Sequence, residues 1–202
     1  MRIGMFNFAN KAFICTKLTI NDDAFDVLNC HMSSGVTESE YNRRADDLKK
    51  AYTSIKNNHE TAVSFIIGDL NFRNRVDVQT ARDMVKNHNL AKTIEAKQDI
   101  VDELLKCDEL TRLLRSENFM FLREQPITFL PSYKFFVNTN DYDIAEGKRI
   151  PSWTDRVLYM VKDSITLSIK NYMVDTETKV SDHKPVILLC SLKLTDYSKV
   201  GS

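Results

Sequence analysis

Two segments near the start of the chain alternate apolar and polar residues, as half-buried strands do. They are residues 12–20, "AFICTKLTI", and residues 24–32, "AFDVLNCHM", and the polar run 21–23 between them is typical of a turn. The pattern therefore predicts a β-hairpin. Because alternate residues of a strand share a face, the second strand is expected to present one set of side chains together: Phe25, Val27, Asn29 and His31.

Helical spacing replaces this alternation over residues 38–58. Residues 62–67, "AVSFII", then form a short apolar run that predicts a buried strand. Residues 77–88 and 99–116 are predicted as helices, and Asp108 is a candidate cap that divides the second helical region. The apolar positions that define the first helix are Tyr41, Ala45, Leu48, Tyr52 and Ile55.

Strands dominate the last part of the chain. A polar loop is expected over residues 136–148, and no repeat or linker interrupts the pattern. Strands and helices alternate early and strands prevail late, so one α/β domain is the simplest interpretation. The strands predicted here are "ITF" (127–129), "RVLYMV" (156–161), "ITLSIKNYM" (165–173) and "PVILLCSLKL" (185–194).

Charge and cysteine content narrow the function. The formal net charge is zero, whereas a general polyanion binder usually carries a clear basic excess, so no nucleic-acid partner is expected. The 4 cysteines are scattered without a CxxC pair, which favours a reducing compartment over zinc or a disulfide framework. No apolar run is long enough to cross a bilayer. We expect a cytoplasmic protein that is peripheral to membranes and touches their surface transiently.

Short polar clusters lie at the ends of the predicted strands, where the loops of a layered fold converge on one rim. In "GDLNFR", Asp69 and Asn71 point one way from the strand end and Leu70 points the other. The clusters are "NCHMSSG" (29–35), "GDLNFR" (68–73), "FLPSYK" (129–134), "KRIPSWTDRVL" (148–158) and "SDHKPV" (181–186).

Each cluster alone has a structural explanation. Asp69 and Asn71 suit turns, His31 could be a hydrogen-bonded core histidine, and Trp153 could simply pack. Together, however, they supply the parts of a phosphoester hydrolase in which water attacks directly, with a divalent ion bound. Histidines His31 and His183, acids Asp69, Asp155 and Asp182, Asn71, and cations Lys134, Lys148, Arg149 and Arg156 make up this set.

These motifs, in this order, resemble the inositol polyphosphate 5-phosphatase family, a branch of the DNase I-like endonucleases, exonucleases and phosphatases. "GDLNFR" is similar to the family's GDLNYR, "FLPSYK" to F-x-P-T-Y-K, and "KRIPSWTDRVL" to K-x-R-x-P-[SA]-W-[CT]-D-R-[IV]-L, and "SDHKPV" is matched in full. The resemblance covers roughly residues 2–193. It implies a four-layer α/β sandwich in which helices flank two packed mixed sheets.

The resemblance also implies roles. Asp69 activates the attacking water, Asn71 and His31 bind the scissile phosphate, and Asp155 orients His183. Asp182 lies near a Mg²⁺ ion. The substrate is a phosphoinositide, such as PtdIns(4,5)P2 or PtdIns(3,4,5)P3, or a soluble inositol polyphosphate. The residues expected to bind its further phosphates are Tyr133, Lys134, Lys148, Arg149 and Arg156.

The chain departs from the family pattern at several positions. "ANKA" replaces a G-N-K-G turn, Gly147 replaces a basic residue, and Arg44 replaces an asparagine. The match begins after the family's W-N and Q-E motifs, the second of which supplies a metal-binding glutamate. We therefore expect residues 1–194 to form a partial catalytic domain that lacks its front strands, with residues 195–202 as a tail.

Two other functions are compatible with the sequence. A nuclease of the same superfamily would share the catalytic residues but would need an extended basic surface rather than a clasp for a second phosphate. A catalytically impaired fragment would act by binding an inositide or a protein partner, and the unmatched W-N and Q-E motifs favour it.

We predict weak Mg²⁺-dependent turnover and poor solubility for purified residues 1–202, because exposed sheet edges and missing metal ligands should compromise both properties. Phosphate release from PtdIns(4,5)P2 under saturating Mg²⁺ measures the turnover. Robust turnover would contradict the expectation of an incomplete site.

Overall fold

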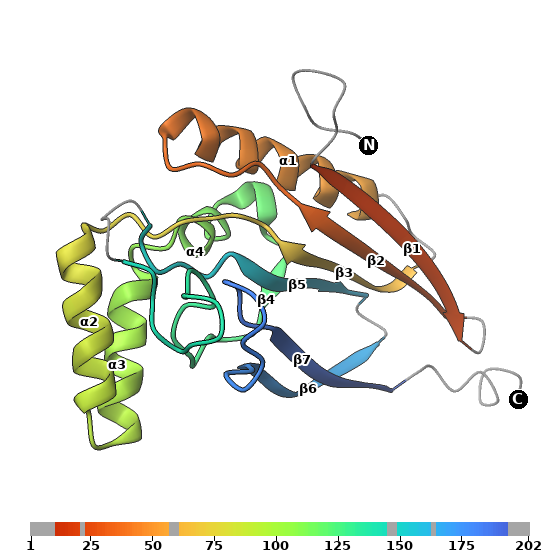
Figure 1. The fold of residues 1–202 in the computed structure, drawn as a ribbon. Helices are drawn as coiled ribbons and strands as arrows, with labels where there is room; N and C mark the ends of the chain where they lie inside the picture. Colours follow the sequence, from red (N-terminus) through yellow and green to blue (C-terminus); the bar gives the residue numbers. More distant parts are fainter. Residues whose placement is uncertain (1–10, 21–22, 57–60, 145–148, 163–164, 194–202) are drawn as a thin grey trace, which may run out of the picture.

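The computed structural model describes residues 11–20, 23–56, 61–144, 149–162 and 165–193. A larger sheet lies between helix α1 on one side and a two-stranded sheet on the other, and the hairpin of helices α2 and α3 packs at one end (Figure 1). Among these residues, no helix combines the length and apolar character needed to cross a bilayer.

The larger sheet has the strand order β1-β2-β3-β5-β4. The predicted hairpin of β1 and β2 is confirmed, although residues 21–22 at its turn lie outside the described residues. β2 and β3 are parallel and the other pairs are antiparallel, so this sheet is mixed as expected. The strands are β1 (Ala12–Ile20), β2 (Asp23–His31), β3 (Thr61–Asp69), β4 (Arg123–Glu124) and β5 (Asp155–Val161).

The smaller sheet pairs β6 (Thr166–Val174) with β7 (Val186–Lys193). The described pairing is antiparallel, so the expectation of a mixed second sheet is not met here. The strand predicted at residues 127–129 is also wrong. The Phe129 carbonyl accepts from the indole of Trp153 (3.0 Å) instead of joining a ladder, and Ile127 is buried beside that indole.

The predicted helices form with small shifts of their ends. Asp77 caps α2, and Asp108 caps α4 by accepting from the Thr111 amide, so the second helical region is divided as expected. Its first half begins at residue 94 rather than 99, where Thr93 supplies the cap. The helices are α1 (Glu38–Lys56), α2 (Val78–Leu90), α3 (Ile94–Leu105) and α4 (Glu109–Leu113), followed by a 3₁₀ turn at Glu117–Phe119.

The main core lies between α1 and the larger sheet. Leu48 and Ile55 of α1 pack with Leu28 of β2 and Ile66 of β3, and all four side chains are almost fully buried. On the opposite face of the sheet, Phe25 and its neighbours pack toward the smaller sheet. The central strands β2 and β3 are therefore largely buried, whereas most of β1 is exposed.

Arg156 of β5 is part of the core rather than of a substrate site. Its guanidinium is fully buried and bonds to Asp108 (2.9 Å) and to Glu124 (2.6 Å and 2.5 Å). Because these carboxylates occupy the guanidinium, the prediction that Arg156 binds substrate is corrected. Its role is to tie β5 to β4 and to the start of α4.

Replacing Arg156 with alanine is expected to lower the free energy of unfolding by about 3–5 kcal/mol, because two buried carboxylates lose their counter-charge. Urea denaturation followed by circular dichroism measures this change. The exposed Arg43 of α1 gives a matched control, Arg43→Ala, expected to change stability by less than about 0.5 kcal/mol. Equal stability of the two variants would contradict the structural role of Arg156.

Candidate active site

Strand register brings three of the predicted catalytic residues to one edge of the larger sheet. His31 ends β2 and is paired with Asp69, which ends the parallel strand β3. Asp69 is in turn paired with Asp155, the first residue of the antiparallel strand β5. Residues far apart in the chain thus become neighbours, because one parallel and one antiparallel pairing align the three strand tips.

The turn after β3 fixes Asn71 against Asp69. Asn71 has a left-handed backbone (φ 57°), which asparagine tolerates better than most residues. Its backbone amide donates to Asp69 Oδ1 (3.0 Å), and its side-chain amide donates to Asp69 Oδ2 (2.9 Å). Leu70 is fully buried on the other side, so the two polar side chains share one side as predicted.

Gly68 makes this approach of β3 to β2 possible. Its φ of 116° disfavours any side chain, and an added Cβ would lie 2.3 Å from the Cys30 carbonyl oxygen. The close passage sets the positions of Asp69 and His31 relative to each other. The His31 Nε2 atom lies 3.5 Å from Asp69 Oδ2, and the His31 side chain remains half exposed.

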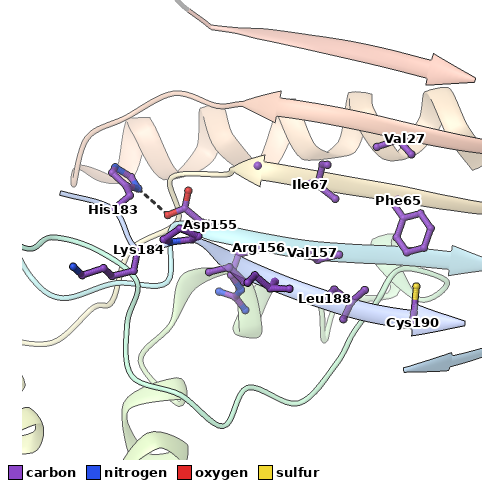
Figure 2. A pocket seen from close by; sticks show the side chains of 14 residues that line it. Val27, Phe65, Ile67, Asp155, Arg156, Val157, His183, Lys184, Leu188 and Cys190 are labelled. Carbon is purple, nitrogen blue, oxygen red and sulfur yellow. Dashed lines mark hydrogen bonds and ion pairs between the residues drawn. The ribbon is translucent and has the colours of Figure 1, made fainter. Parts of the chain in front are cut away.

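Asp155 holds His183, which lies just before β7. His183 Nδ1 bonds to Asp155 Oδ2 at 2.7 Å (Figure 2). The same oxygen accepts from Thr154 Oγ1 (2.9 Å) and Ser132 Oγ (3.2 Å), and the Tyr133 ring lies 4.5 Å from the imidazole. The imidazole is therefore fixed in orientation, and no described residue pairs with its Nε2 atom.

An apolar cavity of about 670 Å³ adjoins this pair. Val27 and Phe65 line it from the larger sheet and Leu188 from β7, with Asp155 and His183 at one end (Figure 2). Apolar walls lower the local dielectric and strengthen the attraction between the imidazolium and the carboxylate.

Two pKa values in the site shift upward. Burial opposes the charged imidazole of His183, but the hydrogen bond and charge of Asp155, with Asp69 and Asp182, outweigh it and raise the pKa of His183. Burial, then the charge of Asp155, raises the pKa of Asp69, although His183 and His31 act in the opposite direction. The site therefore favours a protonated His183 beside a carboxyl whose basicity is increased.

The predicted cation clasp is assembled only in part. Lys134 Nζ bonds to Asp143 (2.9 Å), so its charge is already paired. Arg149 is exposed and lines a separate cavity of about 410 Å³ together with Arg73 and Arg75. Lys148 lies outside the described residues.

A metal site is not complete among the described residues. No group of three or more histidine, cysteine, aspartate or glutamate side chains there is arranged to hold an ion. The paired carboxylates Asp69 and Asp155 would attract a cation, but a hard divalent ion takes six or more oxygen ligands. Asp182, predicted to lie near Mg²⁺, is half-buried beside His183, and its metal role stays a prediction.

Several contributors were missed by sequence reasoning. Arg73 donates to the Asn71 carboxamide oxygen, and its guanidinium lies 4.7 Å from the Tyr133 ring centre. Ser132 and Thr154 donate to Asp155. All three residues fall inside the quoted clusters, so membership of a polar cluster was the available signal. Lys11 was also missed, and its Nζ atom contacts His31 Nε2 at 2.7 Å.

Arg44 of α1 joins two loops next to the site. Its buried guanidinium bonds to Glu109 (2.7 Å) and to the carbonyls of Ser33 (3.2 Å) and Gly35 (2.9 Å). Glu109 also accepts from the Arg73 backbone amide (3.0 Å). Arg44 therefore connects the loop after β2, through Glu109, with the turn that carries Asn71.

Comparison with known proteins places the chain among related sequences. The model of Endonuclease/Exonuclease/phosphatase family 2 matches residues 1–189. The polyphosphatidylinositol phosphatase INP53 of Saccharomyces cerevisiae is 29% identical over 192 residues, which are 92% of this chain and 16% of the yeast protein. Nitrophorin Cim l NP of Cimex lectularius is 30% identical over 174 residues, covering 86% of this chain and 52% of that protein.

Among solved structures, the inositol polyphosphate 5-phosphatase domain of SPsynaptojanin superimposes with a TM-score of 0.73. It was solved with inositol (1,4)-bisphosphate and calcium ion, and it is 23% identical to this chain. The match covers 93% of this chain and 53% of that one, and it establishes the DNase I-like α/β fold. The chain thus spans about half, or less, of the relatives it matches.

The His183–Asp155 pair predicts a distinctive titration. By NMR, His183 should titrate above the ordinary histidine pKa of about 6.5, whereas His88 of α2, whose pKa burial lowers, should titrate below it. Asp155→Asn should bring the pKa of His183 down, because burial remains and its main counter-charge is lost, and should leave His88 unchanged. An unchanged His183 titration in that variant would show that the pair does not govern its charge.

The same pair should make stability depend on pH. The pKa of His183 is higher in the folded than in the unfolded chain, so the stabilisation is fully present below about pH 6.5 and is lost as pH rises through the folded-state pKa. Urea denaturation at a series of pH values measures it, and Asp155→Asn should flatten this part of the profile. A profile of the same shape in both proteins would contradict the assignment.

Proposed function

The chain belongs to Endonuclease/Exonuclease/phosphatase family 2, and on this premise we propose that it acts in 5-dephosphorylation of phosphoinositides or soluble inositol polyphosphates. PtdIns(4,5)P2 and PtdIns(3,4,5)P3 are the lipid substrates proposed. The relatives whose names state an activity support the class of reaction, since INP53 is a polyphosphatidylinositol phosphatase. The proposal also includes Mg²⁺ as the cofactor and a cytoplasmic, membrane-peripheral location.

One observation carries the proposal: the Asp155–His183 pair lies beside Asp69 and Asn71 at a single edge of the sheet. A phosphate bound there would meet a cationic donor and a carboxyl of raised pKa from neighbouring strands. This juxtaposition is what hydrolysis of a phosphate monoester by water needs, because the reaction requires both charge stabilisation and removal of a proton from water.

The residues support a division of roles. Asp69 accepts the proton of the attacking water, and the raised pKa of its carboxyl improves it as a base. His183, held through Nδ1 by Asp155, presents Nε2–H to a phosphoryl oxygen and stabilises the charge there. Water adds to phosphorus as the bond to the inositol oxygen breaks, giving inorganic phosphate. The departing inositol oxygen takes a proton from solvent and becomes a hydroxyl, and the Asp69 carboxyl returns the water proton to solvent. A bound divalent ion would supply further charge neutralisation, and no step above depends on it.

Arg73 and Tyr133 act as positioning residues in this scheme. Arg73 holds the Asn71 side chain by donating to its oxygen, which leaves the amide group directed at Asp69 and at the Met32 carbonyl (3.1 Å). Tyr133 lies between the Arg73 guanidinium and the His183 imidazole. The catalytic groups are thus braced by cation–π and ring contacts as well as by hydrogen bonds.

Nuclease activity of the same superfamily is the competing enzymatic function. A nuclease would use the same catalytic residues, so their arrangement at the ends of the strands does not distinguish between the two activities. The zero net charge favours the phosphatase, because a nuclease gains affinity from an extended basic surface. A binding role without turnover is the remaining alternative.

We expect His183→Ala and Asp69→Asn each to lower kcat for phosphate release by about 10²–10⁴-fold, the usual contribution of a positioned acid or base. Wild type and variants are assayed with Ins(1,4,5)P3 and with PtdIns(4,5)P2, with and without Mg²⁺. His88→Ala is the matched control, since His88 lies in α2 outside the rim, and it should retain wild-type activity.

Plasmid nicking by the same samples distinguishes the alternatives. DNA cleavage without phosphate release would show that the protein is a nuclease rather than a phosphatase. Headgroup binding in calorimetry without turnover of either substrate would favour the binding role. Equal phosphate release by wild type and His183→Ala would contradict the assignment of the catalytic site.

A further inference from the structure

Two loops beside the catalytic rim are joined into one rigid tip. Residues 132–135 and 182–184 run as a short ladder, in which the Phe135 amide donates to the Asp182 carbonyl (3.0 Å) and the Lys184 amide donates to the Ser132 carbonyl (2.8 Å). Tyr133 and His183 form a bridge within this ladder. The catalytic histidine and the tip therefore share one backbone scaffold.

Residues 136–139 follow the first segment of this ladder, and residues 178–180 precede the second. These two loops are here called the paired tip. The Asn138 amide donates to the Lys179 carbonyl (2.7 Å), which connects the loops directly. The buried Lys184 ammonium donates to the carbonyls of Thr139 (2.7 Å) and Thr178 (3.3 Å). The buried ammonium of Lys184 thus holds both loops in place. The loops therefore cannot rearrange to bury their own exposed apolar side chains.

The paired tip exposes apolar side chains that this scaffold cannot bury. Phe136 is 43% exposed, Val137 53% and Val180 80%. The preceding Phe135 is instead buried, stacked on Tyr142 at 4.2 Å. Consecutive phenylalanines thus point in opposite directions, one into the fold and one toward solvent.

Charged side chains of both signs lie at the paired tip, since half-buried Lys179 belongs to it and Asp175 and Glu177 precede its second loop. Lys184 is buried and the Lys134 charge is paired with Asp143, so neither offers a free cation to an anionic partner. Lys179 offsets part of the negative charge of Asp175 and Glu177, so the exposed apolar side chains remain the main contact surface of the tip. Apolar side chains at loop tips near a phosphate-binding rim suit insertion into the interface of a lipid bilayer.

We propose that the paired tip is the surface by which this protein contacts a lipid bilayer, through Phe136, Val137 and Val180. This rests on the proposed function, because it places the rim toward the headgroups of lipid substrates. The tip begins three residues after Tyr133, whose ring contacts the His183 imidazole. Insertion of the tip at the headgroup boundary therefore brings the catalytic edge to the height of a phosphorylated headgroup.

Vesicle co-sedimentation tests the proposal. Phe136→Asp and Val180→Asp should each weaken binding to phosphatidylcholine vesicles carrying PtdIns(4,5)P2 by about tenfold, since apolar burial is lost and a charge enters the interface. Ile94→Asp is the matched control, because Ile94 is 82% exposed at the α2–α3 connection, which lies at the end of the helical hairpin away from the sheets (Figure 1). It should bind vesicles as wild type does.

Turnover of soluble Ins(1,4,5)P3 separates this inference from the function on which it rests. All three variants should hydrolyse it at the wild-type rate, while hydrolysis of vesicle-borne PtdIns(4,5)P2 falls only in the tip variants. If neither substrate is hydrolysed but vesicle binding still depends on the tip, the proposed phosphatase function is contradicted and the proposed lipid-contact surface is supported.

Unchanged vesicle binding in both tip variants, or equal loss in Ile94→Asp, overturns the proposal. A second outcome also overturns it: the wild-type protein does not bind vesicles, and sedimentation velocity shows self-association that Val180→Asp abolishes. The patch would then be an interface between copies of this chain. Matching circular dichroism spectra for all variants verify that the exposed substitutions leave the fold intact.

Discussion

The Asp155 carboxylate organises the site, because one of its oxygens accepts from three side chains that come from separate parts of the chain. His183, Thr154 and Ser132 all donate to Oδ2. Asp155 itself stands at the start of β5, where antiparallel pairing sets it opposite Asp69. The position of this single atom therefore couples the register of the larger sheet to the loop that precedes β7.

That coupling depends on buried charge elsewhere. One residue after Asp155, Arg156 binds Asp108 and Glu124, which fixes the start of β5 against β4 and α4. Glu109, next to Asp108, binds Arg44 and the backbone of Arg73. Two adjacent acids at the start of one short helix thus anchor both strand tips that carry the candidate catalytic carboxyls, Asp69 and Asp155. Buried ion pairs of this kind contribute little net stability, but removing one partner is costly.

The candidate site and the paired tip share one segment of backbone, residues 132–135. Residues 132–135 supply Ser132 to the Asp155 carboxylate and the Tyr133 ring to His183, and then continue into the exposed tip. Backbone hydrogen bonds thus connect the segment that leads to the paired tip with the segment that carries His183. This arrangement links the proposed lipid-contact surface to the proposed catalytic site.

The sequence by itself determined the strands with clear alternation, the helix cap at Asp108 and the histidine, carboxylate and asparagine members of the rim. Strand alternation predicted that Asp69 and Asn71 share a side, although a turn with a left-handed backbone at Asn71 is what holds them together. Asp108 caps a helix because its side chain suits an N-terminus. The alignment of His31, Asp69 and Asp155 needed strand pairing, which joins residues distant in the chain and leaves no local signal.

Tertiary structure alone decided which charged residues reach solvent. Arg149 and Arg156 belong to one motif and look equivalent in the sequence, yet one is exposed and the other is buried between two acids. Segment 127–129 has strand-like composition, but an indole from Trp153 takes the carbonyl that a neighbouring strand would have needed. Burial and partner choice depend on the packing of the whole chain, because desolvation and ion pairing are properties of the three-dimensional surroundings.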